Sequence, residues 1–357
     1  MNPLLELNSL GQSVWLDYIR RDFVTGGGLK KLIEEDGLAG LTSNPAIFEK
    51  AMGGGNEYTS AIRALKAKGI SATDLYEALA IEDIRAAAEL FKPVFDSTKG
   101  LDGFVSLEVS PYLAHDTAAT VAEARRLWKE VARPNVMIKV PGTPEGLPAI
   151  ELLISQDINV NITLLFSRDV YEKVAERYIA GLERRAAEGL DIDRIASVAS
   201  FFVSRIDSAV DPLVPEALRG KTAIANAVLA YESYQRIFSG TRWTNLAEKG
   251  ARPQRLLWAS TSTKNPAYRD VMYVEELIGK NTVNTLPPAT VDAFRDHGKP
   301  RASLEEDVAG AAATLAAVGK HVSLEDITTK LTHDGVKLFA EAFDKLLAAV
   351  EAARKAA

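Results

Sequence analysis

The sequence contains no cysteine and only four histidines, and both shortages exclude classes of chemistry. Without cysteine the chain has no disulfide, zinc–thiolate centre, iron–sulfur cluster or thiol nucleophile. No two histidines have the spacing of HExxH or a similar metal-binding motif. We therefore expect neither a metal ion nor another cofactor. The histidines are His115, His297, His321 and His333.

Excess positive charge and long apolar runs are also missing. The formal net charge is −6 at pH 7, which argues against a nucleic-acid partner, because nucleic-acid binding usually requires a basic face. No stretch approaches the roughly 18 apolar residues of a membrane span. The apolar run near the N-terminus is interrupted by Glu6, Asn8 and Gln12, so it does not have the pattern of a signal peptide. These absences predict a cytoplasmic protein that binds neither nucleic acid nor membrane.

The sequence does contain enough apolar material for a large core, since 47% of its 357 residues are hydrophobic. Eight short apolar segments, bounded by polar residues, glycine or proline, have the pattern of buried strands. They are residues 13–19, 37–44, 103–110, 136–142, 158–167, 197–206, 255–264 and 281–288. Residues 117–132 and 167–189 have helical spacing, and Ser167 is a good N-cap for the second helix.

Strands that alternate with helices predict parallel pairing through right-handed crossovers. Eight such units predict an α/β fold, a closed (β/α)8 TIM barrel formed by residues 1–357 as a single domain. An open doubly wound sheet is the alternative, but no GxGxxG or P-loop motif follows the first strand. We expect extra helices after strand 2, at about 49–101, and at the C-terminus, at about 303–357. The second region carries two capping signals, SLEE at 303–306 and SLED at 323–326.

In a TIM barrel, functional groups gather at the C-terminal ends of the strands and in the loops that follow. Polar residues that interrupt the apolar pattern there are candidates for chemistry. One such residue lies in each of the first seven predicted strands, and an arginine follows in the sixth. They are Asp17, Asn44, Glu108, Lys139, Thr163, Ser200 and Lys264, together with Arg205. Their occurrence on successive strands predicts one shared site.

Lys139 is the most informative of these residues. Its neighbours in the segment VMIKVPG are apolar, and a lysine is rarely fully buried unless it is paired or functional. Burial disfavours the ammonium form, and the free amine is the form that attacks a ketone to give a Schiff base. The alternative is an ion pair inside the barrel with Asp17 or Glu108.

The remaining polar candidates also allow two interpretations. Asp17 and Glu108 are candidate acid/base groups, or else ion-pair partners of Lys139 or Arg205. Asn44 could bind a substrate hydroxyl, although an asparagine before proline commonly starts a turn. Thr163 and Ser200 could equally hydrogen-bond to the backbone.

Three segments resemble the signature segments of the transaldolase family. They are GLTSNPAIF at 40–48, VMIKVPGTPEGLPAIELL at 136–153 and VNITLLFS at 160–167. The resemblance runs from roughly residue 10 to roughly residue 290. The long insert and the extended C-terminal region resemble the longer, bacterial-type branch of that family. Phe201 stands where the common form of the family has proline.

The resemblance implies catalytic roles for four residues. Lys139 would form the Schiff base, and Asp17 would take the proton from the C4 hydroxyl of the substrate. Glu108 and Thr163 would hold the catalytic water.

The resemblance also implies a set of substrate-binding residues. Asn44 and Ser200 would bind the hydroxyls of the ketol unit, and Phe202 would line the site. Arg205 would bind the substrate phosphate, and Lys264 is the best match for a second phosphate ligand.

The function implied is transfer of a dihydroxyacetone unit from sedoheptulose 7-phosphate to glyceraldehyde 3-phosphate. The products would be erythrose 4-phosphate and fructose 6-phosphate, in the non-oxidative pentose phosphate pathway. Partners would be small sugar phosphates, and the protein would be a monomer or a homodimer. The alternatives are a fructose 6-phosphate aldolase-like class I aldolase and a non-catalytic barrel that binds sugar phosphates.

Overall fold

Eight parallel strands form a closed barrel in the computed structural model, which describes residues 2–53, 56–66 and 69–356. Each strand pairs with the next in sequence, and β1 pairs with β8. The strands are β1 (Gln12–Asp17), β2 (Gly40–Thr42), β3 (Phe104–Glu108), β4 (Val136–Pro141), β5 (Val160–Leu165), β6 (Ser197–Phe202), β7 (Arg255–Ala259) and β8 (Thr282–Leu286). The predicted (β/α)8 barrel is therefore confirmed.

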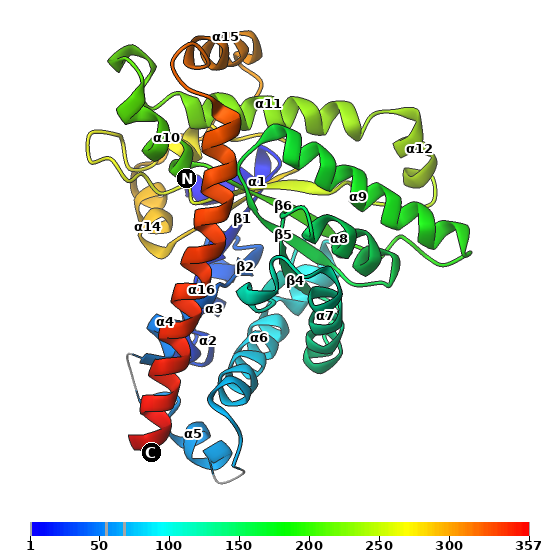
Figure 1. Ribbon diagram of the computed structural model, residues 1–357, viewed down its shortest axis with the longest axis vertical. Coiled ribbons are helices and arrows are strands. Elements are labelled where there is room, and N and C mark those ends of the chain that lie inside the picture. Colours follow the sequence, from blue (N-terminus) through cyan, green and yellow to red (C-terminus); the bar gives the residue numbers. More distant parts are fainter. Residues whose placement is uncertain (1, 54–55, 67–68, 357) are drawn as a thin grey trace.

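Helices surround this barrel and fill the connections between its strands (Figure 1). Those before β4 are α1 (Pro3–Ser9), α2 (Arg21–Thr25), α3 (Gly28–Asp36), α4 (Pro45–Gly53), α5 (Thr59–Lys66), α6 (Ala72–Ser97), the short 3-10 helix η1 (Pro111–Leu113) and α7 (Thr117–Val131). Those between β4 and β7 are α8 (Gly146–Ser155), α9 (Arg168–Ala187), α10 (Ser204–Val210), η2 (Asp211–Leu213), η3 (Glu216–Leu218), α11 (Thr222–Ile237) and α12 (Thr241–Ala247). The last are α13 (Met272–Glu275), α14 (Pro288–His297), α15 (Val308–Val318) and α16 (Leu324–Ala356).

The two clearest helix predictions are confirmed by α7 and α9. The N-cap of α9 is the predicted one, because the Ser167 hydroxyl accepts a hydrogen bond from the Val170 backbone N–H at 3.2 Å. α7 ends where Ala132 adopts a left-handed conformation with φ of 50°. The chain therefore leaves the helix one residue before the predicted end.

All eight strand predictions run past the observed C-terminal ends, and the excess is largest at β6 and β7. At β2, β6 and β7 the excess includes a site residue, so Asn44, Arg205 and Lys264 lie outside the strands. β6 ends at Phe202 because Val203 already has helical dihedral angles, and α10 begins at the next residue. Arg205 is therefore on a helix. β7 ends at Ala259, before Ser260 takes a positive φ of 56°, so Lys264 lies in the loop beyond the strand.

The insert after β2 is helical, as predicted, and consists of α4, α5 and α6. Residues 54–55 and 67–68 of the predicted range lie outside the described residues. A capping box formed by Ser71 and Asp74 starts α6, a helix of 26 residues.

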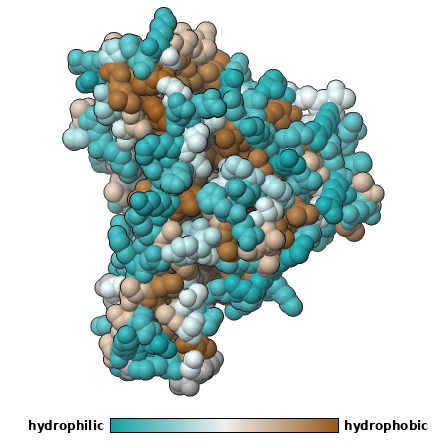
Figure 2. Space-filling model, viewed as in Figure 1, coloured by the Kyte–Doolittle hydropathy of each residue, from teal (hydrophilic) through white to brown (hydrophobic). Residues whose placement is uncertain are grey.

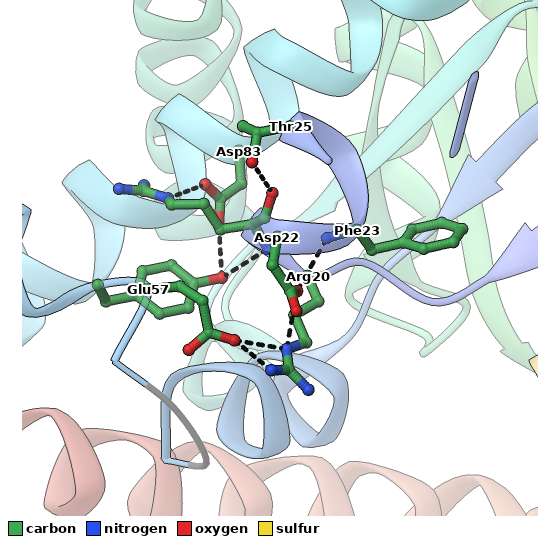
Figure 3. A network of polar contacts seen from close by, with 8 residues as sticks. Arg20, Asp22, Phe23, Thr25, Glu57 and Asp83 are labelled. Carbon is green, nitrogen blue, oxygen red and sulfur yellow. Dashed lines mark hydrogen bonds and ion pairs between the residues drawn. The ribbon is translucent and has the colours of Figure 1, made fainter. Parts of the chain in front are cut away.

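A polar network ties the insert to the loop that follows β1 (Figure 3). Arg20 donates to the Glu57 carboxylate, with Nε 2.8 Å from Oε1. Arg21 donates to Asp83 on α6 at 2.7 Å, and the Tyr58 hydroxyl donates to the other Asp83 oxygen at 2.7 Å. The network therefore fixes the segment directly after the β1 terminus to the insert.

The C-terminal region is also helical, but only one of its two predicted caps is correct. The Ser323 hydroxyl accepts from the Asp326 N–H at 3.2 Å and so caps α16. Ser303 does not start a helix, because its hydroxyl donates instead to the Glu275 carbonyl at 2.6 Å. Asp307 caps α15, accepting from the Gly310 N–H at 2.8 Å. Residue 357 lies outside the described part of the chain.

α16 is 33 residues long and passes in front of the barrel in Figure 1. It packs on α4, α5, α6, η1 and α10, and also on strand β5. Hydrophilic side chains cover most of the face seen from this side (Figure 2), and Lys330, His333 and Lys337 of α16 are exposed. No helix in the described ranges combines the length and apolar character required to cross a membrane.

A buried polar cluster occupies the N-terminal end of the barrel. Asp102 accepts hydrogen bonds from the Ser13 hydroxyl at 2.7 Å and the Trp15 indole at 3.1 Å. Arg255 donates to Asp102 at 2.9 Å and to Ser13 at 2.8 Å. Because every charge in this cluster has a partner, the N-terminal end of the barrel is closed by a paired and hydrogen-bonded group.

Candidate functional site

A cavity of about 180 Å³ opens at the C-terminal ends of the strands. Eight of the nine predicted site residues line it: Asp17, Asn44, Lys139, Thr163, Ser200, Phe202, Arg205 and Lys264. The ninth, Glu108, is in contact with Lys139. The predicted candidates therefore come together in one place, although they are far apart in sequence.

A larger cavity of about 620 Å³ lies between α9, α11, α15 and α16. Two of its basic side chains already face carboxylates, because His115 is 3.1 Å from Glu145 and Arg168 is 3.9 Å from Glu172. The smaller cavity is the stronger candidate site, because buried titratable groups converge there.

Lys139 lies in the middle of β4, and its side chain is 6% exposed. Its Nζ donates to the Ser43 carbonyl at 3.0 Å and lies 3.2 Å from Glu108 Oε2. The strand register causes this pairing, because Glu108 of β3 is directly opposite Lys139 of β4. The alternative interpretation, an ion pair inside the barrel, is thus correct for Glu108. The pairing leaves Lys139 on the cavity wall.

The two carboxylates of the site have environments that favour their protonated forms. Burial raises the pKa of Asp17, an effect partly offset by the charge of Lys139, the Thr42 hydroxyl 2.7 Å away and the charge of Lys264. Burial also raises the pKa of Glu108, against the opposing effect of Lys139, and the negative charge of Asp17 raises it further. Both groups are therefore poised to exchange protons closer to neutral pH than an exposed carboxylate.

Thr163 is fully buried in β5, next to a strand irregularity. Its neighbour Leu164 has a positive φ of 62°, which is unusual for a bulky side chain. Among the described residues, neither Thr163 Oγ1 nor Glu108 Oε2 has a hydrogen-bond partner of good geometry. The backbone-bonded alternative for Thr163 is therefore wrong. Two buried polar atoms remain able to bind a small polar molecule.

Ser200 belongs to a chain of side-chain hydrogen bonds across the barrel. Its hydroxyl donates to Asn161 Oδ1 at 2.6 Å, and Asn161 Nδ2 donates to Ser106 Oγ at 3.0 Å. The backbone-bonded alternative is wrong here too. The sequence reasoning missed Asn161, although it interrupts the apolar run of β5 just as Thr163 does.

The position of Asn44 is compatible with both of its interpretations, turn initiation and binding of a substrate hydroxyl. Its side-chain oxygen accepts from the Ile47 N–H at 3.1 Å, at the start of α4, as expected for an asparagine that begins a turn. The same side chain lines the cavity. Its amide group can still donate to a ligand.

Positive charge gathers at the side of the cavity formed by α10 and the loop after β7. The Arg205 guanidinium lies 5.2 Å from the Phe202 ring centroid, and burial lowers its pKa. Lys264 donates to Ser262 at 2.8 Å; partial burial of its amine and the nearby Arg205 charge both lower its pKa. No carboxylate of the described residues lies at ion-pair distance from either cation, although the charge of Asp17 acts to raise the pKa of Lys264. Two cations that repel each other in this way favour binding of an anion.

An ion pair with Asp207 or another acid is the structural alternative to phosphate binding by Arg205. Within the described ranges no carboxylate lies at ion-pair distance from Arg205. Asp207 instead accepts from the Ala223 N–H and the Tyr273 hydroxyl, both at 2.8 Å. The alternative is therefore wrong.

One wall of the cavity comes from outside the barrel and was not predicted. Phe339 of α16 lines the cavity, with its ring centroid 5.8 Å from Lys139 Nζ. An apolar residue in an amphipathic helix carries no sequence signal of such a position. Only the packing of α16 brings it there.

Comparison with known proteins gives a family and several similar sequences. Residues 14–350 match the family model described as transaldolase/fructose-6-phosphate aldolase, so the similarity extends beyond residue 290 into α16. The chain is 48% identical to a transaldolase of Trichodesmium erythraeum, over 98% of this chain and 97% of the relative. It is 48% identical to a transaldolase of Thiobacillus denitrificans, over 98% and 100%. It is 47% identical to a transaldolase of Thermobifida fusca, over 97% and 96%.

Proposed function

The chain belongs to the transaldolase/fructose-6-phosphate aldolase family, and we propose that it is a transaldolase, a transferase of ketone-containing groups. It transfers a dihydroxyacetone unit from sedoheptulose 7-phosphate to glyceraldehyde 3-phosphate. This reversible reaction gives erythrose 4-phosphate and fructose 6-phosphate, and it is a step of the non-oxidative pentose phosphate pathway.

One observation carries the proposal: the Lys139 amine is buried in contact with Glu108 and reaches a cavity that also contains Asp17 and Arg205. The amine attacks the ketone carbon of the donor, and loss of water gives a protonated imine. This imine withdraws electrons while the adjacent C3–C4 bond breaks. Asp17 takes the proton of the C4 hydroxyl, and the aldose phosphate leaves.

The three-carbon unit then remains on Lys139 as an enamine. Its nucleophilic carbon attacks the aldehyde of the acceptor, and the oxygen formed recovers the proton from Asp17. Water adds to the new imine and releases the product and the free amine. Glu108 and Thr163 hold this water. The role is supported by Thr163 Oγ1 and Glu108 Oε2, which have no hydrogen-bond partner of good geometry among the described residues, although Glu108 Oε2 lies 3.2 Å from the Lys139 amine.

The other lining residues recognise the substrate. Asn44 and Ser200 bind the hydroxyls of the three-carbon unit, and Phe202 packs against it. Arg205 and Lys264 bind the phosphate, a role supported by two positive charges that have no carboxylate at ion-pair distance among the described residues. Ser260 and Ser262 also line the cavity, close to Lys264 in the sequence. Their hydroxyls can donate hydrogen bonds to phosphate oxygens.

The test is borohydride reduction in the presence of fructose 6-phosphate, followed by peptide mass spectrometry. We expect a stable three-carbon adduct on Lys139, and no adduct in Lys139→Arg, which keeps the charge but cannot form the imine. An adduct on Lys264 or another lysine refutes the assignment. If the wild-type protein carries no adduct on any lysine, the result supports the alternative of a non-catalytic barrel that only binds sugar phosphates. Activity should persist in excess EDTA, because the imine already supplies the electron sink.

A fructose 6-phosphate aldolase is the second candidate, since the matching family model carries both names. It would use the same Lys139 imine but release free dihydroxyacetone without an acceptor. Product analysis distinguishes the two enzymes. If free dihydroxyacetone forms faster than the three-carbon unit is transferred to an acceptor aldose, the protein is an aldolase.

We also propose that residues 1–357 act as a single domain in the cytoplasm, as a monomer or homodimer. Light scattering on the purified protein gives the molar mass, and a tetramer would exclude both states.

A further inference from the structure

The cavity around Lys139 is closed on one side by a residue from the last helix. Phe339 is 8% exposed, and its ring faces the amine from 5.8 Å. This distance is within the range of a cation–π contact, which favours a cationic nitrogen over a neutral one. The other lining residues near the amine, such as Asn44 and Thr163, are mostly polar. Phe339 is thus an apolar wall beside the atom that carries the imine.

A close contact between α16 and strand β5 sets the position of this ring. A Cβ atom at Gly335 would lie 2.8 Å from Leu164 Cδ2, so the glycine allows the helix to approach the strand. Leu164 has the positive φ noted above and directly follows Thr163. Since Phe339 is four residues after Gly335, it lies one helical turn further along the same face. The contact on β5 therefore directs the ring over Lys139.

The next turn of α16 anchors the helix on α6 and η1. Phe343 packs edge-on against Tyr76 of α6, with ring centroids 5.6 Å apart, and near Tyr112 of η1, at 6.2 Å. Phe339 is therefore held between two fixed contacts, at Gly335 and Phe343. A side chain held in this way keeps its place while substrates exchange.

We propose that Phe339 determines whether the enamine on Lys139 is transferred or released; this inference rests on the proposed function. Release requires that the nucleophilic carbon takes a proton, that water adds to the resulting imine carbon, and that the C–N bond breaks to give dihydroxyacetone and the free amine. In transfer the same carbon attacks the acceptor aldehyde before it is protonated, and the product imine is then hydrolysed by water as in release. The routes therefore differ at the enamine carbon, and the Phe339 ring limits the space for water beside it, which slows the protonation that only release requires.

The experiment compares two rates for the same protein. One is the formation of free dihydroxyacetone from fructose 6-phosphate without acceptor, and the other is transfer to erythrose 4-phosphate. In Phe339→Ala we expect the ratio of release to transfer to rise about tenfold or more. Phe339→Leu, which keeps most of the apolar volume, should change it less. The matched control is Leu338→Ala, because Leu338 is adjacent on α16 but 50% exposed.

A second variant displaces the Phe339 ring without changing that side chain. Gly335→Val places side-chain atoms against Leu164 and shifts α16, so its ratio should rise in the same direction as that of Phe339→Ala. An unchanged ratio in both variants, with borohydride trapping on Lys139 intact, overturns the inference and leaves Phe339 a packing residue. Absence of trapping in the wild type contradicts the proposed function itself, so the two failures are distinguishable.

Discussion

The barrel contains a buried ion pair at each end, and the two pairs differ in how completely they are satisfied. At the N-terminal end Arg255 and Asp102 are 2.9 Å apart, with side chains 6% and 9% exposed. At the C-terminal end Lys139 and Glu108 are 3.2 Å apart, and both side chains are 6% exposed. Burial and charge are therefore nearly equal at the two ends.

The difference lies in the surroundings of each pair. Asp102 has two neutral donors in addition to Arg255, namely Ser13 and Trp15. Glu108 Oε2, by contrast, is unpartnered in the described residues apart from the nearby Lys139 amine, and a cavity adjoins that amine. A saturated pair holds the fold together, while an unsaturated pair retains the capacity to bind and to exchange protons.

The largest expected effect comes from removing the cation of each pair. Lys139→Met should reduce transfer by roughly 10³-fold or more, because no imine can form. The fold should survive, since Glu108 has a raised pKa and can take up a proton when its partner is gone. Arg255→Met should instead reduce the free energy of unfolding by about 3 kcal/mol or more, because Asp102 is left as a buried charge.

Urea unfolding and transfer assays on both variants measure this contrast. Arg255→Met should keep normal activity per folded molecule under conditions in which it is folded. If Lys139→Met proves the less stable of the two variants, the Lys139–Glu108 pair contributes more to the stability of the fold than the Arg255–Asp102 pair, and the contrast between them is wrong.

The next effect separates the two carboxylates at the C-terminal end. Asp17→Ala should still form an imine with fructose 6-phosphate but should cleave it about a hundredfold more slowly, because the base for the C4 hydroxyl is missing. Glu108→Ala should slow imine formation itself, also by about a hundredfold, because the water loses its partner. Borohydride trapping at timed intervals distinguishes the steps. Equal trapping rates in both variants and the wild type would refute the role of Glu108.

A smaller effect is expected from the phosphate side of the cavity. Arg205→Ala should raise KM for fructose 6-phosphate by about tenfold to a hundredfold, since a charge-assisted hydrogen bond to phosphate is lost. The KM for unphosphorylated fructose should change little. Steady-state assays with both sugars provide the measurement. Equal losses for both sugars would mean that Arg205 holds α10 in place and that the phosphate binds elsewhere.

The smallest effect is a shift in pH dependence. Asp17 acts as a base only when ionised, so activity falls as the pH drops through its raised pKa. The positive charge of Lys264 lowers that pKa, so Lys264→Gln should raise it and move the acid limb of kcat/KM to higher pH. Ser262→Ala, which keeps the lysine charge, is the control. A limb that moves to lower pH would contradict the assignment of Asp17 as the base.

The barrel was predictable because each strand is a short apolar run between polar breaks. The errors at β6 and β7 arose because apolar and small polar residues continue past the point where the chain turns. Val203 is as apolar as the strand before it, yet it takes helical dihedral angles. The false cap at Ser303 has a similar origin, since its hydroxyl has a tertiary partner, Glu275, that no local pattern reveals.

The candidate site was predictable where a polar residue interrupts a strand, as at Asp17, Lys139 and Thr163. Their convergence in one cavity follows from the barrel, although their roles remain predictions. Asn161 obeys the same rule and could have been found. Phe339 could not, because its place beside Lys139 depends on how α16 packs on β5.

The position of α16 in the chain has a consequence for the order in which the protein is made. The ribosome synthesises β8 before α16, so all eight strands are available for pairing while the helix is still missing. The nascent barrel then presents the Lys139 amine without its apolar cover. On the role proposed for Phe339, the preference for transfer over release is therefore complete only after α16 has packed on β5.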